Sequence, residues 1–302
     1  MLKIPSLFYG SSVDHVDTSC SACGSENRNA KNLVFTSSRG SEKSWSHCGH
    51  CGAFFCNDPF QVDQEVQHGT TASYGTLESG LKNAVNLQHL YNNILRLVQR
   101  YGTPACGSWL DLGCSFGGLL CLAKNAGYDV TGVDILPQAV DYIRSLGMAA
   151  YVVHSATQVP ADEGFDVVTA IDSNYYWPDQ RTEFSQIYQK LNPGGLFVVR
   201  TADKSWLVKL GLALQGLFPG LGKRAVAMAL NDHRFSMPHA SLLNLAVETG
   251  FWVESVDIRD AYYSEGSPFF VRAYFRISAI LYKVSGLYIA PGYIVVLRKL
   301  KT

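Results

Sequence analysis

The sequence predicts an α/β fold: a mostly parallel, seven-stranded sheet with helices on both faces, preceded by a small cysteine-rich module. Two observations lead to this prediction. Beyond residue 105, short apolar segments alternate with segments of helical periodicity, and the connections between them are short. Repeated βα units of this kind form parallel sheets covered on both faces. Before residue 60, two Cys-x-x-Cys-Gly motifs are separated by a polar segment.

The composition is that of a globular protein. The chain has 302 residues, of which 47% are hydrophobic and 17% charged, and its formal net charge is zero. Zero net charge argues against broad nucleic-acid binding through phosphate neutralisation. We find no apolar run long enough to span a membrane and no secretory signal. We therefore expect a cytoplasmic protein, in which grouped cysteines bind metal rather than form disulfides.

The N-terminal module, expected over residues 1–60, contains the motifs Cys20-Ser-Ala-Cys23-Gly and Cys48-Gly-His-Cys51-Gly. In each motif, two thiolates of one tight turn can occupy adjacent corners of a tetrahedron. The spacing predicts a closed, structural zinc-ribbon site with four ligands: Cys20, Cys23, Cys48 and Cys51. Bound Zn²⁺ would supply much of the folding free energy of so small a module, about 10 kcal/mol or more.

Three neighbouring side chains offer alternative zinc ligands. His47, His50 and Cys56 lie close to the second motif in the sequence, so a site with three cysteines and one histidine is an alternative. Four unligated thiols in a loop are the other alternative. The paired motifs are the simpler solution.

Residues 61–105 are expected to form a linker and a leading helix. Residues 57–80 are polar and rich in turn-forming residues. From Leu81 to Tyr101, apolar residues recur at helical spacing, and Gly102 and Pro104 end the pattern. This helix is expected to pack beside the sheet.

The third unit, residues 106–302, contains the predicted sheet. Its expected parallel strands are residues 109–112, 129–134, 149–153, 165–171 and 196–200. The helices expected between them are residues 117–126, 137–146 and 179–191. Residues 252–259 and 293–300 are expected to close the sheet as an antiparallel pair.

The first strand–turn–helix unit is rich in glycine. It reads Asp111-x-Gly113-x-Ser115-x-Gly117, and Asp134 ends the next strand. Glycine lets the backbone approach a ligand closely, and an acid at the tip of the second strand can hold ribose hydroxyls. This pattern resembles the S-adenosylmethionine (SAM) site of class I methyltransferases, which have a Rossmann-like fold. The segment 191–199, Leu-Asn-Pro-Gly-Gly-Leu-Phe-Val-Val, resembles a late motif of the same family.

The resemblance implies SAM as the cofactor and assigns residues to it. Asp134 would accept hydrogen bonds from the ribose hydroxyls, and Asp111 would hold the methionine end or order the turn. Asp172 would contact the amino group of the cofactor or act as a base. The residues implied in cofactor binding are Asp111, Gly113, Ser115, Gly117, Asp134, Ile135, Ser155 and Asp172.

The candidate catalytic residues are Asp172, Tyr176 and His233. The first two follow the fourth strand, where methyl donor and acceptor meet. His233 begins a segment, 232–251, that resembles a broad methyltransferase group with ubiquinone-pathway and sugar-modifying members. Many members of that group carry Glu-His where this chain has Tyr175-Tyr176, which makes His233 the more attractive base. A structural, capping histidine is the alternative.

Two insertions, at about residues 203–238 and 260–291, are apolar and cationic. They are expected to form a helical cap over the acceptor site, or else an amphipathic surface that contacts a membrane or a lipid-linked acceptor. The expected activity is methyl transfer to a small molecule, either a sugar of a surface-glycan or nucleotide-sugar pathway or a lipid-like compound. An RNA or protein methyltransferase that grips its substrate with the ribbon, and a non-enzymatic zinc-dependent scaffold, are the alternatives.

Overall fold

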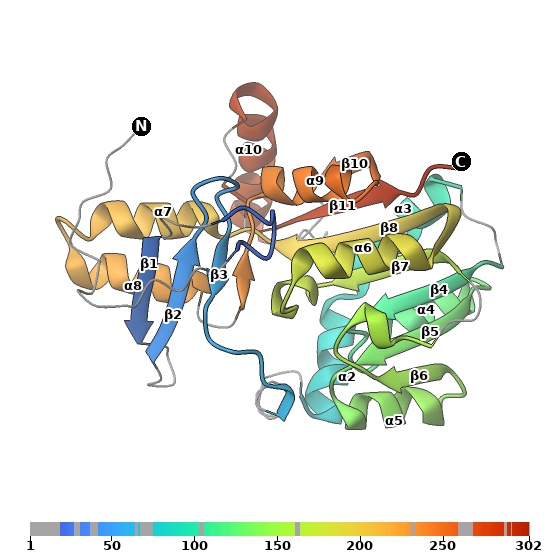
Figure 1. The fold of residues 1–302 in the computed structure, drawn as a ribbon. Coiled ribbons are helices and arrows are strands. Elements are labelled where there is room, and N and C mark those ends of the chain that lie inside the picture. The colour runs from blue at the N-terminus through green and yellow to red at the C-terminus, as the bar shows by residue number, and fades with distance from the viewer. Residues whose placement is uncertain are drawn as a thin grey trace.

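A computed structural model of the chain describes residues 19–26, 31–36, 42–63, 66, 75–102, 106–160, 164–230, 233–258, 268–286, 289–290 and 292–301. Figure 1 shows the α/β unit on the right, with the N-terminal strands and two helices of the first insertion on the left. The helix of the second insertion stands above them.

The central sheet has seven strands in the order β10-β11-β8-β7-β4-β5-β6. The strands are β4 (Ser108–Leu112), β5 (Asp129–Asp134), β6 (Ala149–Val152), β7 (Phe165–Ile171), β8 (Leu191–Ala202), β10 (Trp252–Asp257) and β11 (Gly292–Arg298). Strands β4 to β8 pair in parallel. Strand β11 is antiparallel to both β8 and β10. The α/β fold with a mostly parallel sheet is therefore confirmed.

Helices cover both faces of this sheet, because the strands alternate buried side chains between two cores. On β8, Phe197 and Val199 join one core and Leu196 and Val198 join the other. The first core also contains α6 (Gln180–Lys190) and α9 (His239–Glu248). The second contains α3 (Gln88–Arg100), α4 (Gly118–Asn125) and α5 (Pro137–Ser145).

The leading helix differs from its expected form. It begins at residue 77 and is divided into α2 (Leu77–Asn86) and α3 by a break at Leu87. Its early start has a local cause: Thr76 and Ser79 form a capping box, which satisfies free backbone donors of the first turn. Both α2 and α3 lie against α4, where Ala84 and Tyr91 face Gly118.

The N-terminal strands form a second sheet together with a strand of the first insertion. Its order is β1 (Lys31–Thr36), β2 (Glu42–His47), β3 (Phe54–Cys56) and β9 (Phe235–Ser236). One side of this sheet packs on α7 (Ser205–Leu214) and α8 (Pro219–Leu230), and Phe55 on the other side joins the core of the α/β unit. The N-terminal segment and residues 203–238 thus fold as one structural body.

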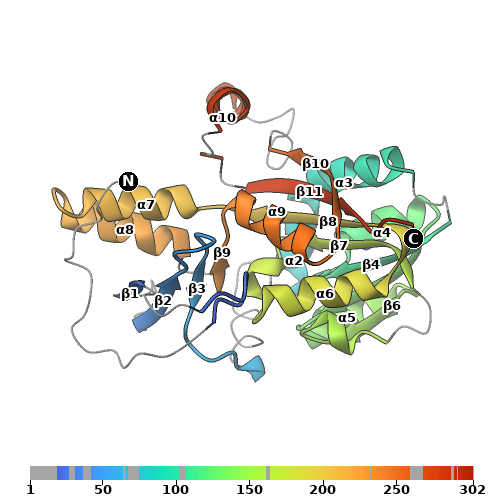
Figure 2. The same ribbon diagram turned by 45° about the horizontal axis from the view of Figure 1, so that its top comes forward.

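The second insertion contributes α10 (Phe269–Ser285), which Figure 2 shows end-on, beyond the edge of the sheet. Among the residues of the two insertions that the structure describes, none lines the cavity, and the cap over the acceptor site stays a prediction. Among the described helices, none combines the length and apolar character required to cross a bilayer.

Candidate functional site

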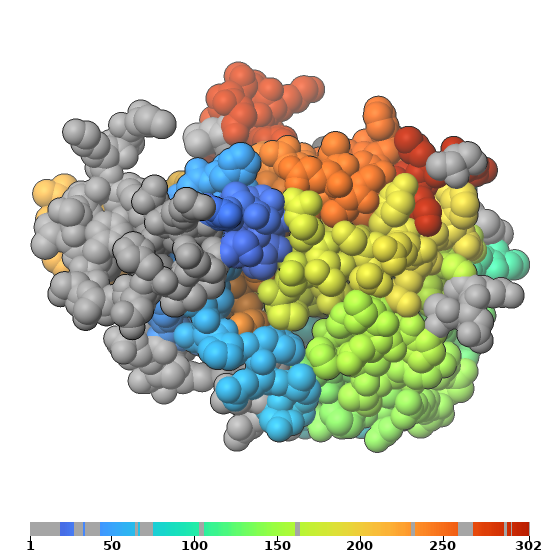
Figure 3. Space-filling model, viewed as in Figure 1, coloured from blue at the N-terminus to red at the C-terminus, as the bar shows by residue number. Residues whose placement is uncertain are grey.

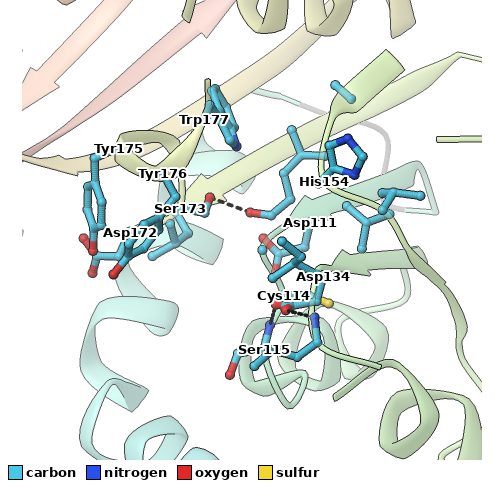
Figure 4. Close-up of a pocket in the computed structure, with 18 of the residues that line it drawn as sticks. Asp111, Cys114, Ser115, Asp134, His154, Asp172, Ser173, Tyr175, Tyr176 and Trp177 are labelled. Atoms are coloured by element: carbon cyan, nitrogen blue, oxygen red, sulfur yellow. Dashed lines mark hydrogen bonds between the residues drawn. The ribbon is translucent and has the colours of Figure 1, made fainter. Parts of the chain in front are cut away.

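A cavity opens at the carboxyl ends of β4, β5 and β7, beside the position where the strand order reverses. Ligands of open α/β sheets bind at this position. Figure 4 shows two groups of residues across the cavity. We call residues 111–115 and 134–136 the β4–β5 wall, and residues 172–177 the η2 wall, after the short helix η2 (Asn174–Tyr176).

The turn of the β4–β5 wall has an unusual backbone. Gly113 has a φ of +79°, and a Cβ atom there would lie 2.5 Å from the Cβ of Ser173. Glycine is therefore required both for the turn and for the close approach of the η2 wall. Ser115 lines the cavity with a φ of 47°. Gly117 is the N-cap of α4 and lies behind the described cavity lining, so its contribution is to the turn.

Asp134 is placed where a ribose acceptor is expected. It is buried at the end of β5, and its two carboxylate oxygens accept hydrogen bonds from the backbone N–H groups of Ser115 (2.8 Å) and Leu136 (2.9 Å). Burial raises its pKa, against the lowering effect of these bonds. Each oxygen keeps a second lone pair, so this cavity-lining carboxylate can still receive a pair of hydroxyls.

Asp111 lies deeper in the same wall. Its Oδ1 accepts a hydrogen bond from Thr169 Oγ1 at 2.7 Å, and Thr169 Oγ1 in turn accepts one from Trp109 Nε1 at 2.9 Å. Burial, with a smaller contribution from the nearby Asp134, raises the pKa of Asp111 to about 7, against the lowering effect of the Thr169 bond. A cationic group in the cavity would favour its ionised form.

Two further residues expected to contact the cofactor line the cavity: Ile135 and Ser155. Ser155 caps a short helix, η1 (Ala156–Gln158), and accepts a hydrogen bond from Thr157 N. The adjacent Ala156 N–H donates to Glu183 Oε2 at 2.8 Å. Residues 154–157 contain no acid of their own. Glu183 of α6 places a carboxylate beside this segment.

Asp172 and Tyr176 line the cavity from the η2 wall. Asp172 pairs with the buried Arg200, and its Oδ1 has no hydrogen-bond partner among the described residues. Its φ of 56° is uncommon for a residue other than glycine. Backbone strain of this kind concentrates at functional sites, and here it accompanies a buried carboxylate oxygen without a partner in the described part of the chain.

His233 occupies a different place from the one expected of a base. It lies behind Tyr175, with ring centroids 3.9 Å apart, rather than on the described cavity lining. Burial lowers its pKa to about 3, and the positive charges of Lys204 and Arg200 act in the same direction. A histidine with this pKa is a weak base, so the geometry favours a structural role.

The cavity lining that was not expected from the sequence includes one group from before the first strand of the central sheet: Phe60, Asn83, Leu87 and Tyr91. Leu87 and Tyr91 belong to the apolar stripe that predicted the leading helix, but periodicity does not say that this stripe reaches a cavity. Burial raises the pKa of Tyr91. Phe60 lies just after the N-terminal sheet and has no local signal at all.

The four motif cysteines lie together, with all Sγ atoms within 4.8 Å of one another. The Sγ atoms of Cys20 and Cys51 are 3.8 Å apart, and those of Cys23 and Cys48 are 3.7 Å apart. A tetrahedron with Zn–S bonds of about 2.3 Å has edges of about 3.8 Å. The spacing of the thiols therefore fits a zinc ion.

The electrostatics of this cluster also suit a cation. A hydrogen bond from the Cys51 thiol lowers the pKa of Cys20 to about 5, so one of these two thiols readily loses its proton. Thiolates are the form that binds metal. Among the described residues, His47, His50 and Cys56 stand outside the group of four.

The N-terminal sheet is connected to the η2 wall through Arg234. Cys56 N donates to Arg234 O at 2.8 Å, and Arg234 N donates to Tyr175 O at 2.9 Å. The Arg234 side chain donates to Asp58 O and lies over the Phe60 ring at 5.4 Å. One residue thus joins the N-terminal sheet to two residues of the cavity lining.

The cluster itself is also bound to the α/β unit. Arg181, at the start of α6, donates from its backbone to Ser21 O at 3.2 Å and from its side chain to Cys23 O at 3.0 Å. Ser241, in α9, donates to Cys51 O. Each cysteine motif is therefore held by a helix that packs on the sheet.

Comparison with known proteins identifies the family. A family model described as a methyltransferase domain matches residues 87–256, more than half of the chain. The chain is 34% identical over 96 residues to the 2-methyl-6-phytyl-1,4-hydroquinone methyltransferase of Synechocystis sp., covering 30% of each protein. It is 30% identical over 165 residues to the O-methyltransferase resE of Aspergillus sclerotiorum, covering 50% of this chain and 57% of the relative. The chain thus spans from 30% to 57% of the length of these two curated relatives.

Solved structures show the same fold. N-methyltransferase NodS of Bradyrhizobium japonicum, in complex with S-adenosyl-L-homocysteine, aligns with a TM-score of 0.50 at 14% identity, covering 80% of this chain and 99% of that one. A chain from the Haloferax volcanii Trm112 methyltransferase activator complex aligns with a TM-score of 0.51 at 16% identity, covering 81% and 100%. Together with the family match and the strand order, these likenesses identify the chain as a member of the methyltransferase-domain family, the class I SAM-dependent methyltransferases.

Proposed function

We propose that this protein transfers a methyl group from SAM to a small-molecule acceptor. The observation that carries the proposal is the position of Asp134, with both carboxylate oxygens fixed by backbone N–H groups at the edge of the cavity. When bound, SAM supplies a sulfonium methyl group that an acceptor lone pair can displace. The contribution of the protein is to orient both partners and to exclude water.

The two walls divide this work in the proposed reaction. Asp134 would hold the ribose hydroxyls, and ionised Asp111 would face the cationic methionine end. Across the cavity, the aromatic faces of Tyr175, Tyr176 and Trp177 would stabilise a sulfonium. The carboxylate of Asp172, which pairs with Arg200, would accept the proton of an O–H or N–H acceptor.

A small molecule is the acceptor class we favour. Relatives of this chain are named for a phytylated hydroquinone and for O-methyl transfer. A sugar or a lipid-like compound fits the aromatic lining of the η2 wall. The alternative of an RNA or protein substrate gripped by the ribbon has less support, because the N-terminal sheet packs on both sides against this chain.

We also propose that Cys20, Cys23, Cys48 and Cys51 bind one structural Zn²⁺ ion. Four thiolates close the tetrahedron and leave no open position for catalysis. The ion would fix the N-terminal sheet and, through Arg234, the backbone at Tyr175. Metal loss would then disturb the η2 wall before the β4–β5 wall.

Calorimetric titration with SAM tests the cofactor assignment. Asp134→Ala removes charge-assisted hydrogen bonds worth about 1.5–3 kcal/mol, so its affinity for SAM should fall by about 10- to 100-fold. The matched control is Asp141→Ala on α5, an exposed acid outside the cavity, which should bind SAM like the wild type. If the wild type fails to bind SAM, or if Asp134→Ala binds it with unchanged affinity, the proposed function is wrong.

A further inference from the structure

Helix α10 presents an apolar face to solvent. Its other side packs on the body through Phe275 and Ser278, which are buried. The exposed face carries large apolar residues at the spacing of one helical stripe, each between 55% and 80% exposed: Phe270, Ile277, Ile280 and Val284. In Figures 1 and 2, α10 projects from the body, and in Figure 3 it stands out at the top of the surface.

The charges beside this stripe all have one sign. Residues 268–286 contain Arg272, Arg276 and Lys283 and no acid, although the whole chain has 25 basic and 25 acidic residues. Arg276 and Lys283 are exposed and occupy the flank of the stripe. An exposed apolar stripe with a basic flank is typical of helices that lie in a membrane interface.

The turn between α7 and α8 repeats this combination. Leu217, Phe218 and Leu221 are more than half exposed there. Lys223 and Arg224 follow directly, and residues 205–230 contain no acid. Exposed large apolar residues and positive charge without a nearby acid in the sequence thus occur together on α10 and around the α7–α8 turn.

Both insertions leave the central sheet at the same edge. Helix α7 follows the carboxyl end of β8, and α10 follows β10, which runs parallel to β8 because both are antiparallel to β11. The cavity opens at this carboxyl edge. A partner bound to the insertions would therefore sit at the cavity side of the molecule.

The charges distinguish between two partners for this face. In a second copy of the chain, pairing of α10 with α10 would bring two basic flanks together, with no acid on either helix to balance them. An anionic lipid surface supplies negative charge at its headgroups and an apolar layer beneath them. We propose that α10 and the α7–α8 turn form a docking surface for an anionic membrane.

Vesicle flotation of the full-length chain tests this surface without any methyl acceptor. The probes are phosphatidylcholine vesicles with and without phosphatidylglycerol. The wild type should bind the anionic vesicles at least about tenfold more tightly than the neutral ones, and added salt should weaken the binding. Combined Phe270→Ser, Ile277→Ser and Val284→Ser should lower the binding to anionic vesicles by about tenfold or more.

The matched control is Val247→Ser on α9, an exposed apolar residue outside the sequence of both insertions, which should bind vesicles like the wild type. Calorimetry with SAM separates this inference from the proposed function, because the triple variant should keep the wild-type affinity for SAM. Equal or absent binding of the wild type to the two vesicle types would overturn the proposal, as would full binding by a folded triple variant. A wild-type dimer that the triple variant converts to a monomer, without vesicle binding, would assign the face to a second copy instead.

Discussion

The two walls of the cavity are held in place by different kinds of contact. The β4–β5 wall is fixed within one strand–turn–helix–strand unit, by bonds from Ser115 and Leu136 to Asp134. The η2 wall depends on distant segments. Arg234, which follows this wall in the chain, bonds to the Tyr175 backbone. Phe60, which precedes it by more than a hundred residues, also lines the cavity.

In the proposed function, the cofactor side of the cavity therefore depends on local contacts and the acceptor side on distant ones. The β4–β5 wall needs only local geometry, so it tolerates variation elsewhere in the chain. The η2 wall takes its position from the N-terminal sheet and the first insertion. In this protein, a metal-binding module far from the cofactor would thereby shape the side of the cavity that faces the acceptor.

Of the changes predicted here, loss of a zinc ligand should have the largest effect on stability, and this effect should fall on the N-terminal sheet. Cys48→Ser removes a buried ligand from the proposed zinc site, whose metal would contribute on the order of 10 kcal/mol to folding. The wild type should contain about one zinc ion per chain and the variant almost none, and the N-terminal sheet should unfold at lower temperature. Elemental analysis and thermal unfolding measure these changes. Cys106→Ser, an exposed cysteine outside the cluster, is the control and should keep its metal. A wild type purified without zinc would refute the metal site.

Asp111, in the β4–β5 wall, should have a smaller effect, on how stability depends on pH. Folding raises the pKa of Asp111 to about 7, so the folded state binds more protons than the unfolded state between about pH 4 and pH 7. Stability from this group should therefore decrease as pH rises through that range, by about 1 kcal/mol per pH unit. Asp111→Asn should remove this slope while leaving an oxygen for Thr169 to bond. Urea unfolding at pH 5 and pH 7 tests this, and an unchanged slope in the variant would contradict it.

His233, which stacks behind the η2 wall, should change the pH dependence of stability in the opposite direction. The pKa of His233 is lowered to about 3, so below about pH 6.5 the unfolded state takes up a proton that the folded state does not. Stability from His233 should therefore decrease as pH falls from 6.5. Between pH 7 and pH 5, His233→Phe, which keeps a ring against Tyr175, should lose about 2 kcal/mol less stability than the wild type. The same urea series measures this; equal losses in the two proteins would show that His233 is protonated in the folded state.

The same difference, between local and distant contacts, decided which features could be predicted from the sequence. The spans of β5 and β7 were predicted to the residue, because apolar runs bounded by turn residues are local signals. The break at Leu87 was missed, since the apolar stripe continues across it. The pairing of β3 with β9 joins residues far apart in the chain and leaves no local pattern. For the same reason, Phe60 was missed.

Hydrogen exchange with and without metal tests most directly whether the N-terminal module holds the η2 wall in place. After a chelator removes zinc, the amides of β9 and of residues 175–177 should lose protection, while those of 113–115 and β5 keep theirs. The retained protection should increase when SAM is added to either form. Simultaneous loss of protection in both walls would contradict the account, because the cavity would then be one unit. Unchanged protection in the η2 wall would contradict it too, because the N-terminal module would then play no part in holding that wall.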